Sequence, residues 1–205
     1  MAVLTLAVPR VSAYAILFPE RSRLSHSVVA KGEQERLQSA LDAAISWWDA
    51  PIFFYQKENL LGEQTRKLAY QSRKTSYAER IRLIENGLVR GAIKPYKLAR
   101  LARLRVLSDS DYKNGLAALR LSAELGGNLQ NLYMPRFITL HALWPKMSKA
   151  EREDMKFMVI KAINYDLGAL IKFAKTNPRA RIMVRKALKD DPIAFSKYVR
   201  DYLRP

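Results

Sequence analysis

The side chains best suited to binding chemistry are cations interleaved with tyrosines between Gln64 and Arg105. This stretch holds twelve Lys and Arg, and its only acids are Glu79 and Glu85, so its local charge is twelve minus two, or +10. Clustered cations neutralise phosphates, and an aromatic face can stack on a base. The pattern therefore favours binding to the backbone of a nucleic acid.

The predicted contacts with nucleic acid come from two basic regions. The first supplies Arg66, Lys67, Tyr70, Arg73, Lys74, Tyr77, Arg90, Lys94, Tyr96, Lys97, Arg100 and Arg103. The second, from Lys175 to Pro205, has nine Lys and Arg and three Asp, or +6, and supplies Arg179, Arg181, Arg185 and Lys186. Because the cations are spread over several elements, we expect RNA or single-stranded DNA in preference to sequence-specific duplex DNA.

Catalytic chemistry has little support in the residue pattern. His26 and His141 are the only histidines, neither lies in an H-E-x-x-H motif, and there is no cysteine. The densest carboxylate group is Glu151, Glu153 and Asp154. A metal-dependent nuclease needs convergent carboxylates, but acids at the start of a helix are also favoured by the helix dipole. We expect no enzyme activity, metal or cofactor, and keep a carboxylate-dependent nuclease as an alternative.

The composition predicts a folded basic protein. Of 205 residues, 49% are hydrophobic, and 36 Lys and Arg outnumber 19 Asp and Glu to give a net charge of +17. Such an imbalance attracts polyanions. No apolar run reaches the roughly 18 residues that a membrane span requires, so we expect no membrane partner. A cytoplasmic location is the preferred interpretation.

The N-terminal stretch is predicted to form a small β element of two segments, Val3–Val8 and Val11–Phe18, which are rich in strand-favouring residues. Pro9 and Arg10 interrupt its apolar run, which argues against a signal peptide. Export and an organelle transit peptide remain as alternatives, so cleavage of the first 20 residues is left open.

The helical pattern begins at Glu33 and ends before Pro51, where an aromatic core follows. The basic region then predicts three short helices. One spans about Leu60–Ser72, one begins at Ser76 with a Ser76–Glu79 capping box, and one begins at Pro95. With turns at Gly87 and Gly91, the last two resemble a helix-turn-helix in outline, which gives duplex-DNA binding as an alternative.

Helix signals continue to the C-terminus. A helix over about Asp109–Leu125, with Ser108 as its cap, stops at Gly126–Gly127. A capping box at Ser148 and Glu151 opens a long helical pattern to about Lys175. Pro178 and Pro192 suit the start of two further helices, with Asp191 as the cap before Pro192.

Together these patterns predict a mainly α protein, a bundle of about eight helices with a small N-terminal β element. Residues 1–125 would carry the β element and the main basic surface, and residues 128–205 would form a C-terminal helical region. The two could also form one domain with a hinge at 126–127. The expected function is non-catalytic binding of nucleic acid, within a ribonucleoprotein or a DNA-processing assembly with other protein subunits. The alternative is an inhibitor or adaptor that docks on an acidic protein.

Overall fold

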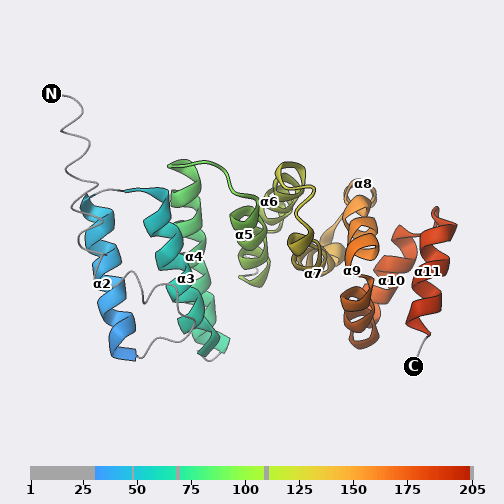
Figure 1. Ribbon diagram of the computed structural model, residues 1–205, viewed down its shortest axis with the longest axis horizontal. Coiled ribbons are helices and arrows are strands. Elements are labelled where there is room, and N and C mark those ends of the chain that lie inside the picture. Colours follow the sequence, from blue (N-terminus) through green and yellow to red (C-terminus); the bar gives the residue numbers. More distant parts are fainter. Residues whose placement is uncertain (1–30, 48, 68–69, 109–110, 204–205) are drawn as a thin grey trace. The chain divides into compact units, whose positions relative to one another are not determined.

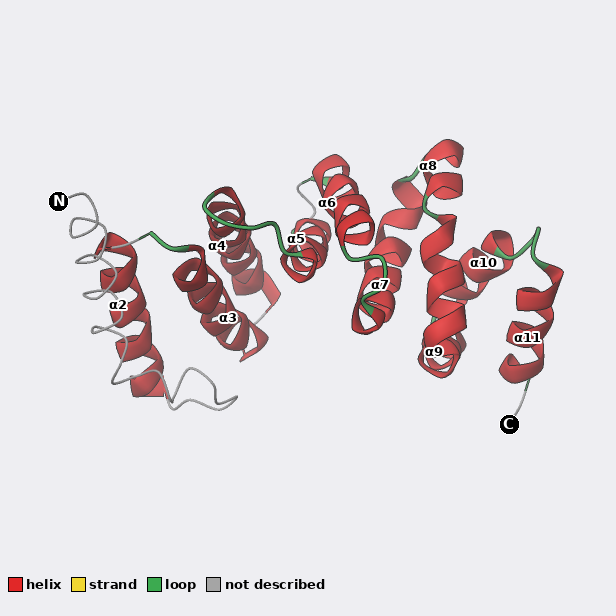
Figure 2. Ribbon diagram, turned by 45° about the horizontal axis from the view of Figure 1, so that its top comes forward, coloured by secondary structure: helices red, strands yellow, loops and turns green. Residues whose placement is uncertain are grey.

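The structure is a computed structural model that describes residues 31–47, 49–67, 70–108 and 111–203, and every regular element in these ranges is a helix. The prediction of a mainly α chain is therefore confirmed. Figure 2 shows the helices in red, joined by loops in green. The predicted β segments lie outside the described residues. The helices group into two compact units, one ending at Ile93 and one beginning at Lys94.

The first unit is built, in its described part, from α2 (Lys31–Trp47), α3 (Pro51–Lys67) and α4 (Tyr70–Val89). α3 packs against both α2 and α4, and Figure 1 shows these helices side by side. Leu37 and Leu41 of α2 are fully buried against α3.

Pro51 begins α3, earlier than the predicted start at Leu60. Proline is tolerated in the first helical turn because its missing N–H would have no helical partner there. Phe53, Phe54 and Tyr55 are no more than 6% exposed, which confirms the predicted aromatic core. An unbroken aromatic run has no helical periodicity, so the sequence pattern did not reveal the first turns of α3.

α4 continues through two positions where the sequence predicts a helix start and a turn. Ser76 is not a cap, because it lies within α4, where its hydroxyl is hydrogen bonded to the hydroxyl of Thr65 on α3. Gly87 is not in a turn but lies within α4, where Tyr55 packs closely. A Cβ at Gly87 would lie 2.5 Å from Cε1 of Tyr55, so glycine serves the close approach of α3 and α4.

The second unit contains the remaining helices. They are α5 (Pro95–Leu107), α6 (Tyr112–Leu125), α7 (Tyr133–Leu143), α8 (Lys149–Asp154), α9 (Lys156–Thr176), α10 (Pro178–Ala187) and α11 (Pro192–Tyr202). α5 and α6 form a tightly packed pair, and α7 contacts both of them as well as α9. α10 and α11 both pack on α9 (Figure 1). Phe137, Leu140 and Ile163 are fully buried in its core.

Most local cap signals are confirmed in this unit. Pro95 lies in the first turn of α5, and Ser148 forms the predicted capping box with Glu151. Asp191 caps α11 by accepting a hydrogen bond from the backbone N–H of Ala194 over 2.9 Å. The cap of α6 is Asp111 and not Ser108.

The long helical pattern from Lys149 to Lys175 is interrupted twice. α8 ends at Asp154, and α9 has non-helical angles at Asp166, where φ is −147° and ψ is 55°. The carboxylate of Asp166 accepts a hydrogen bond from the backbone N–H of Ala169 over 3.2 Å, as a helix cap does. The apolar stripe of α9 continues across the break at Asp166, so periodicity alone could not show that break.

The Gly126–Gly127 turn lies inside the second unit. Gly126 is the C-cap of α6, as its position in the sequence predicts. The proposed hinge and the division at this turn stay predictions.

Candidate nucleic-acid interface

α10 presents a cationic arc to solvent. Its buried side chains are Ala180, Met183, Val184 and Ala187. Successive helical residues are rotated by about 100°, so the opposite arc carries the residues between them. That arc holds the exposed side chains of Arg179, Arg181, Ile182, Arg185 and Lys186.

The cationic arc belongs to a longer stretch without acids. Residues 167–189 contain no Asp or Glu. The stretch contains seven cations, and all of them are exposed: Lys172, Lys175, Arg179, Arg181, Arg185, Lys186 and Lys189. We call these seven side chains the α9–α10 cationic surface. The sequence prediction included four of them and omitted Lys172, Lys175 and Lys189, although the absence of acids between Asp166 and Asp190 was visible in the sequence.

The acids that follow this surface have partners of their own. Asp190 forms an ion pair with Lys156 on α9, with 2.8 Å between Oδ2 and Nζ. The hydrogen bond and the charge of Lys156 lower the pKa of Asp190, so its carboxyl is ionised at neutral pH. Asp191 caps α11. Neither carboxylate is among the ion-pair partners of α10 in the described residues.

Two tyrosines of α11 lie near α10. Tyr198 is 2% exposed, and its ring centroid is 5.6 Å from that of the half-buried Tyr202. Burial raises the pKa of Tyr198, whereas the charges of Arg181 and Arg185 lower it. Tyr198 is therefore a core residue beneath the cationic arc and is not available for stacking.

The predicted contacts on α5 are partly engaged within the protein. Lys94, Tyr96 and Arg103 are exposed, whereas Lys97 and Arg100 are half-buried. The hydroxyl of Tyr96 donates a hydrogen bond to the side-chain oxygen of Asn131 over 2.8 Å. α5 therefore offers a second, smaller cationic surface.

In the first unit, the three predicted cations whose side chains the structure describes are dispersed and already have partners within the protein. Arg66 forms an ion pair with Glu63 at 3.2 Å, and the guanidinium of Arg73 lies 3.5 Å from the backbone oxygen of Arg66. Arg90 forms an ion pair with Asp49 at 2.6 Å. Arg73 lies near the start of α4 and Arg90 directly after its end, so at 1.5 Å of rise per residue they are about 25 Å apart. The described side chains of this unit therefore do not bring the predicted contacts together.

Of the remaining predicted contacts of the first unit, the structure describes the side chain of Tyr77 alone. Tyr77 is half-buried on α4. Lys67, Tyr70 and Lys74 have helical backbones, and their side chains lie outside the described part of the structure.

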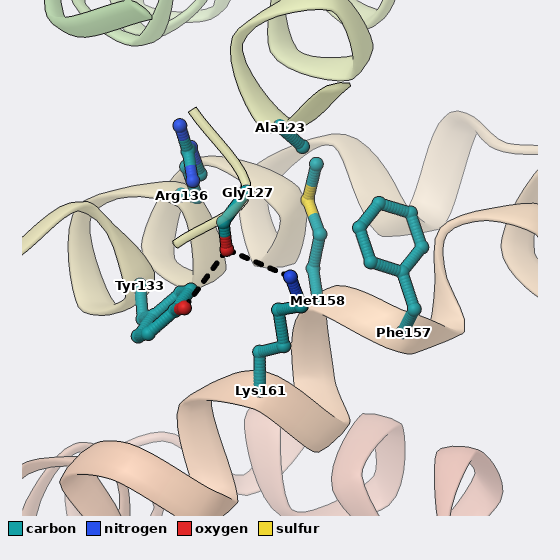
Figure 3. A pocket seen from close by; sticks show the side chains of 7 residues that line it. All are labelled: Ala123, Gly127, Tyr133, Arg136, Phe157, Met158 and Lys161. Carbon is teal, nitrogen blue, oxygen red and sulfur yellow. Dashed lines mark hydrogen bonds between the residues drawn. The ribbon is translucent and has the colours of Figure 1, made fainter. Parts of the chain in front are cut away.

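A small pocket lies between α6, α7 and α9 (Figure 3). Figure 3 shows Tyr133 and Lys161 both donating hydrogen bonds to the backbone oxygen of Gly127, over 2.8 and 2.7 Å. The ammonium group of Lys161 also lies 5.9 Å from the centroid of the Tyr133 ring. The pocket has a volume of about 10 Å³, which is room for about one water molecule. It is too small for a nucleotide.

The carboxylates considered for a nuclease each have a separate partner. Glu151 accepts hydrogen bonds from the Ser148 backbone over 2.7 Å and from Tyr112 over 2.8 Å. Asp154 forms an ion pair with Arg120, and Glu153 forms one with Lys156. Within the described ranges, no group of three His, Cys, Asp or Glu side chains is placed to hold a metal ion.

His141 is half-buried, and its ring meets the ring of Phe173 edge to face at 5.3 Å. Burial lowers its pKa, and the charge of Arg179 lowers it further, so the imidazole is neutral at neutral pH. His141 therefore packs against α9 through the ring of Phe173.

None of the helices in the described ranges is long and apolar enough to cross a membrane. Comparisons of the chain with protein-family models, curated proteins and solved structures found no match. A function must therefore be inferred from the surface of the molecule.

Proposed function

We propose that this protein binds the phosphate backbone of a nucleic acid without catalysing a reaction. The observation that supports this function is the α9–α10 cationic surface, where seven exposed cations occur with no intervening acid. Seven exposed cations in one stretch of 23 residues without an acid give this part of the chain a high local positive charge, which attracts polyanions. A polyanion would release condensed counterions on binding there.

An extended polyanion fits this surface better than a small anion. The seven cations occupy two helices and the residues that follow α10, and residues 172 to 189 cover several helical turns. A small phosphate compound would instead need a concave site with convergent donors. The pocket of the second unit is too small for this purpose, and Gly127 already accepts the hydrogen bonds of its Lys161 and Tyr133.

RNA or single-stranded DNA remains the favoured ligand. The cations extend from α9 to the end of α10, and the flexible backbone of a single strand can place its phosphates along such a distribution. A helix that reads bases in a groove would carry its contacts on one short face. The helices of the helix-turn-helix alternative, α4 and α5, belong to different compact units. We propose that binding serves a ribonucleoprotein or DNA-processing assembly.

The direct test is the affinity of the Arg181→Glu, Arg185→Glu double variant for labelled oligonucleotides, measured by fluorescence anisotropy over a range of salt concentrations. These side chains are exposed, so the fold should persist. Affinity should weaken by a similar factor on every sequence, because phosphate contacts carry no sequence information. The slope of log affinity against log salt should become shallower by about two units.

A matched control is the Lys113→Glu, Lys146→Glu double variant. It changes the net charge by the same amount at exposed positions of the second unit outside the α9–α10 cationic surface. We expect it to retain most of the affinity. If both double variants weaken binding equally, only the net charge matters and the proposed surface is wrong.

An acidic protein partner is the second candidate. Ile182 is 51% exposed in the middle of the cationic arc, and an apolar anchor ringed by charges is typical of a protein interface. Ile182→Ala should then weaken binding to the protein partner while leaving the affinity for oligonucleotides unchanged. This candidate is favoured if the wild type co-purifies with a protein and without nucleic acid, and if Ile182→Ala no longer retains that protein.

A further inference from the structure

The first half of α9 carries an exposed aromatic ridge that the binding of phosphates does not explain. Phe157, Lys161 and Tyr165 are spaced at i, i+4 and i+8, so they lie on one face of the helix. Phe157 is 37% exposed and Tyr165 is 57% exposed. Large aromatic side chains lose hydrophobic stabilisation when they face water, so this ridge suggests a ligand.

The ring of Tyr165 is held in place by α7. Its centroid lies 4.8 Å from that of Tyr133, with 31° between the ring planes. Tyr133 is itself fixed, since it is 3% exposed and its hydroxyl donates to the backbone oxygen of Gly127. Tyr165 is therefore supported on one side and open on the other, so binding there would need little further ordering.

Exposed cations follow this ring in the chain. Lys172 and Lys175 are exposed in the helical segment that begins after the break at Asp166, seven and ten residues beyond Tyr165. The acid next to Tyr165, Asp166, caps the following helical segment through Ala169. An aromatic ring beside a line of cations is the combination that sites for single-stranded nucleic acids use.

We propose that Tyr165 stacks on an unpaired base of a single strand whose phosphates lie on the α9–α10 cationic surface. This inference rests on the proposed function and narrows the ligand to nucleic acid with unstacked bases. In a duplex both faces of a base are covered by its neighbours, so no face is open to Tyr165. A single strand can turn one base outward onto the ring.

The test compares wild type with Tyr165→Ala on three labelled probes of equal length, namely oligo(dT), oligo(U) and a DNA duplex. Affinity for the single strands should fall roughly tenfold, and affinity for the duplex should not change. The salt slope on every probe should stay the same, because the ring contacts no phosphate. A loss on both single strands or on either one supports the proposal, and a loss on only one shows on which of the two strands the ring stacks.

Three further variants control for folding and for generic loss of apolar surface. Tyr165→Met can still pack on Tyr133 but lacks a flat ring, so it should lose the same affinity as Tyr165→Ala. Tyr165→Phe keeps the ring and should bind like wild type. Ile193→Ala removes an apolar side chain that is 83% exposed on α11 and should have no effect.

The proposal is overturned if Tyr165→Ala binds the single strands normally, or if it weakens the duplex to the same extent. It is also overturned if Tyr165→Ala loses only a protein partner. Failure of this inference can be separated from failure of the proposed function. If the Arg181→Glu, Arg185→Glu variant loses affinity and salt dependence while Tyr165→Ala does not, only the stacking role is wrong. If neither variant changes affinity, the proposed function is wrong as well.

Discussion

The guanidinium of Arg136 caps the carboxyl end of α6 by donating a hydrogen bond to the backbone oxygen of Gly126 over 3.0 Å. It also donates two hydrogen bonds to Ser122, one to the backbone oxygen and one, over 3.1 Å, to the hydroxyl group. Arg136 is 2% exposed, and the three acceptors of these hydrogen bonds are neutral oxygens. The last carbonyls of a helix lack helical partners and carry partial negative charge, which is the complement that this buried cation needs.

We expect Arg136→Met to destabilise the protein by about 2–4 kcal/mol, because it leaves buried carbonyls of α6 without donors. Chemical denaturation followed by circular dichroism would measure the loss. The control is Arg120→Met, which removes an exposed ion pair with Asp154 and should change stability by less than about 1 kcal/mol. Equal effects of the two substitutions would contradict the role assigned to Arg136.

Two glycine substitutions should act in opposite directions. Gly87→Ala places a Cβ 2.5 Å from Cε1 of the buried Tyr55 and should destabilise the first unit by about 1–3 kcal/mol. Gly168→Ala meets no atom within 4 Å on α9 and should stabilise by about 0.5 kcal/mol, because alanine loses less backbone entropy in a helix. Thermal unfolding of both variants is the measurement. A stabilising Gly87→Ala would contradict the packing of α3 against α4.

The capping box of α8 should make stability depend on acid pH. The backbone N–H of Ser148 and the hydroxyl of Tyr112 both hydrogen bond to Glu151 and lower its pKa below the ordinary 4.5. The contribution of a carboxyl with a lowered pKa is fully present above its unfolded pKa and is lost as pH falls through the folded pKa. Melting temperatures measured from pH 7 to 2 should show a smaller acid-dependent fall for Glu151→Gln than for wild type. An unchanged acid profile would contradict this role.

The same contact should delay ionisation of Tyr112. Burial and the hydrogen bond to Glu151 raise its pKa from 10.0 to about 12. Because the unfolded chain ionises at lower pH, this contribution to stability is present below pH 10 and is lost as pH rises towards 12. Absorbance titration should show one fewer tyrosine titrating near pH 12 in Tyr112→Phe. If the variant instead loses a tyrosine that titrates near pH 10, the contact with Glu151 does not persist in solution.

Divalent metal should have no part in binding. We expect chelators to leave affinity unchanged, and magnesium or manganese to produce no cleavage of labelled RNA or DNA. The carboxylates Glu151 and Asp154 already serve a helix cap and an ion pair. Metal-dependent cleavage that disappears in Glu151→Ala and Asp154→Ala would establish the nuclease alternative.

The sequence alone determined the features that depend on neighbours within one helical turn. The Ser148–Glu151 box and Asp191 mark helix starts because a cap satisfies N–H groups two or three residues away. Pro95 marks a helix start because its missing N–H would have no helical partner in the first turn. The buried stripe of α10, and hence its cationic arc, follows from the 3.6-residue period. The charge of the candidate interface was therefore visible before any packing was known.

Tertiary structure decided which cations enter ion pairs with distant acids and which stay exposed. Arg80 is paired with Glu58 across 22 residues and Arg90 with Asp49 across 41, so neither ion pair could be read from local spacing. It also explains why a glycine lies within α4. The ring of Tyr55 on α3 leaves no room for a Cβ at Gly87. Ion pairs and close approaches depend on which helix faces meet in space. The acid-free stretch of α9 and α10 keeps its seven cations exposed, whereas the longer basic stretch before it places several of its cations in contacts within the protein.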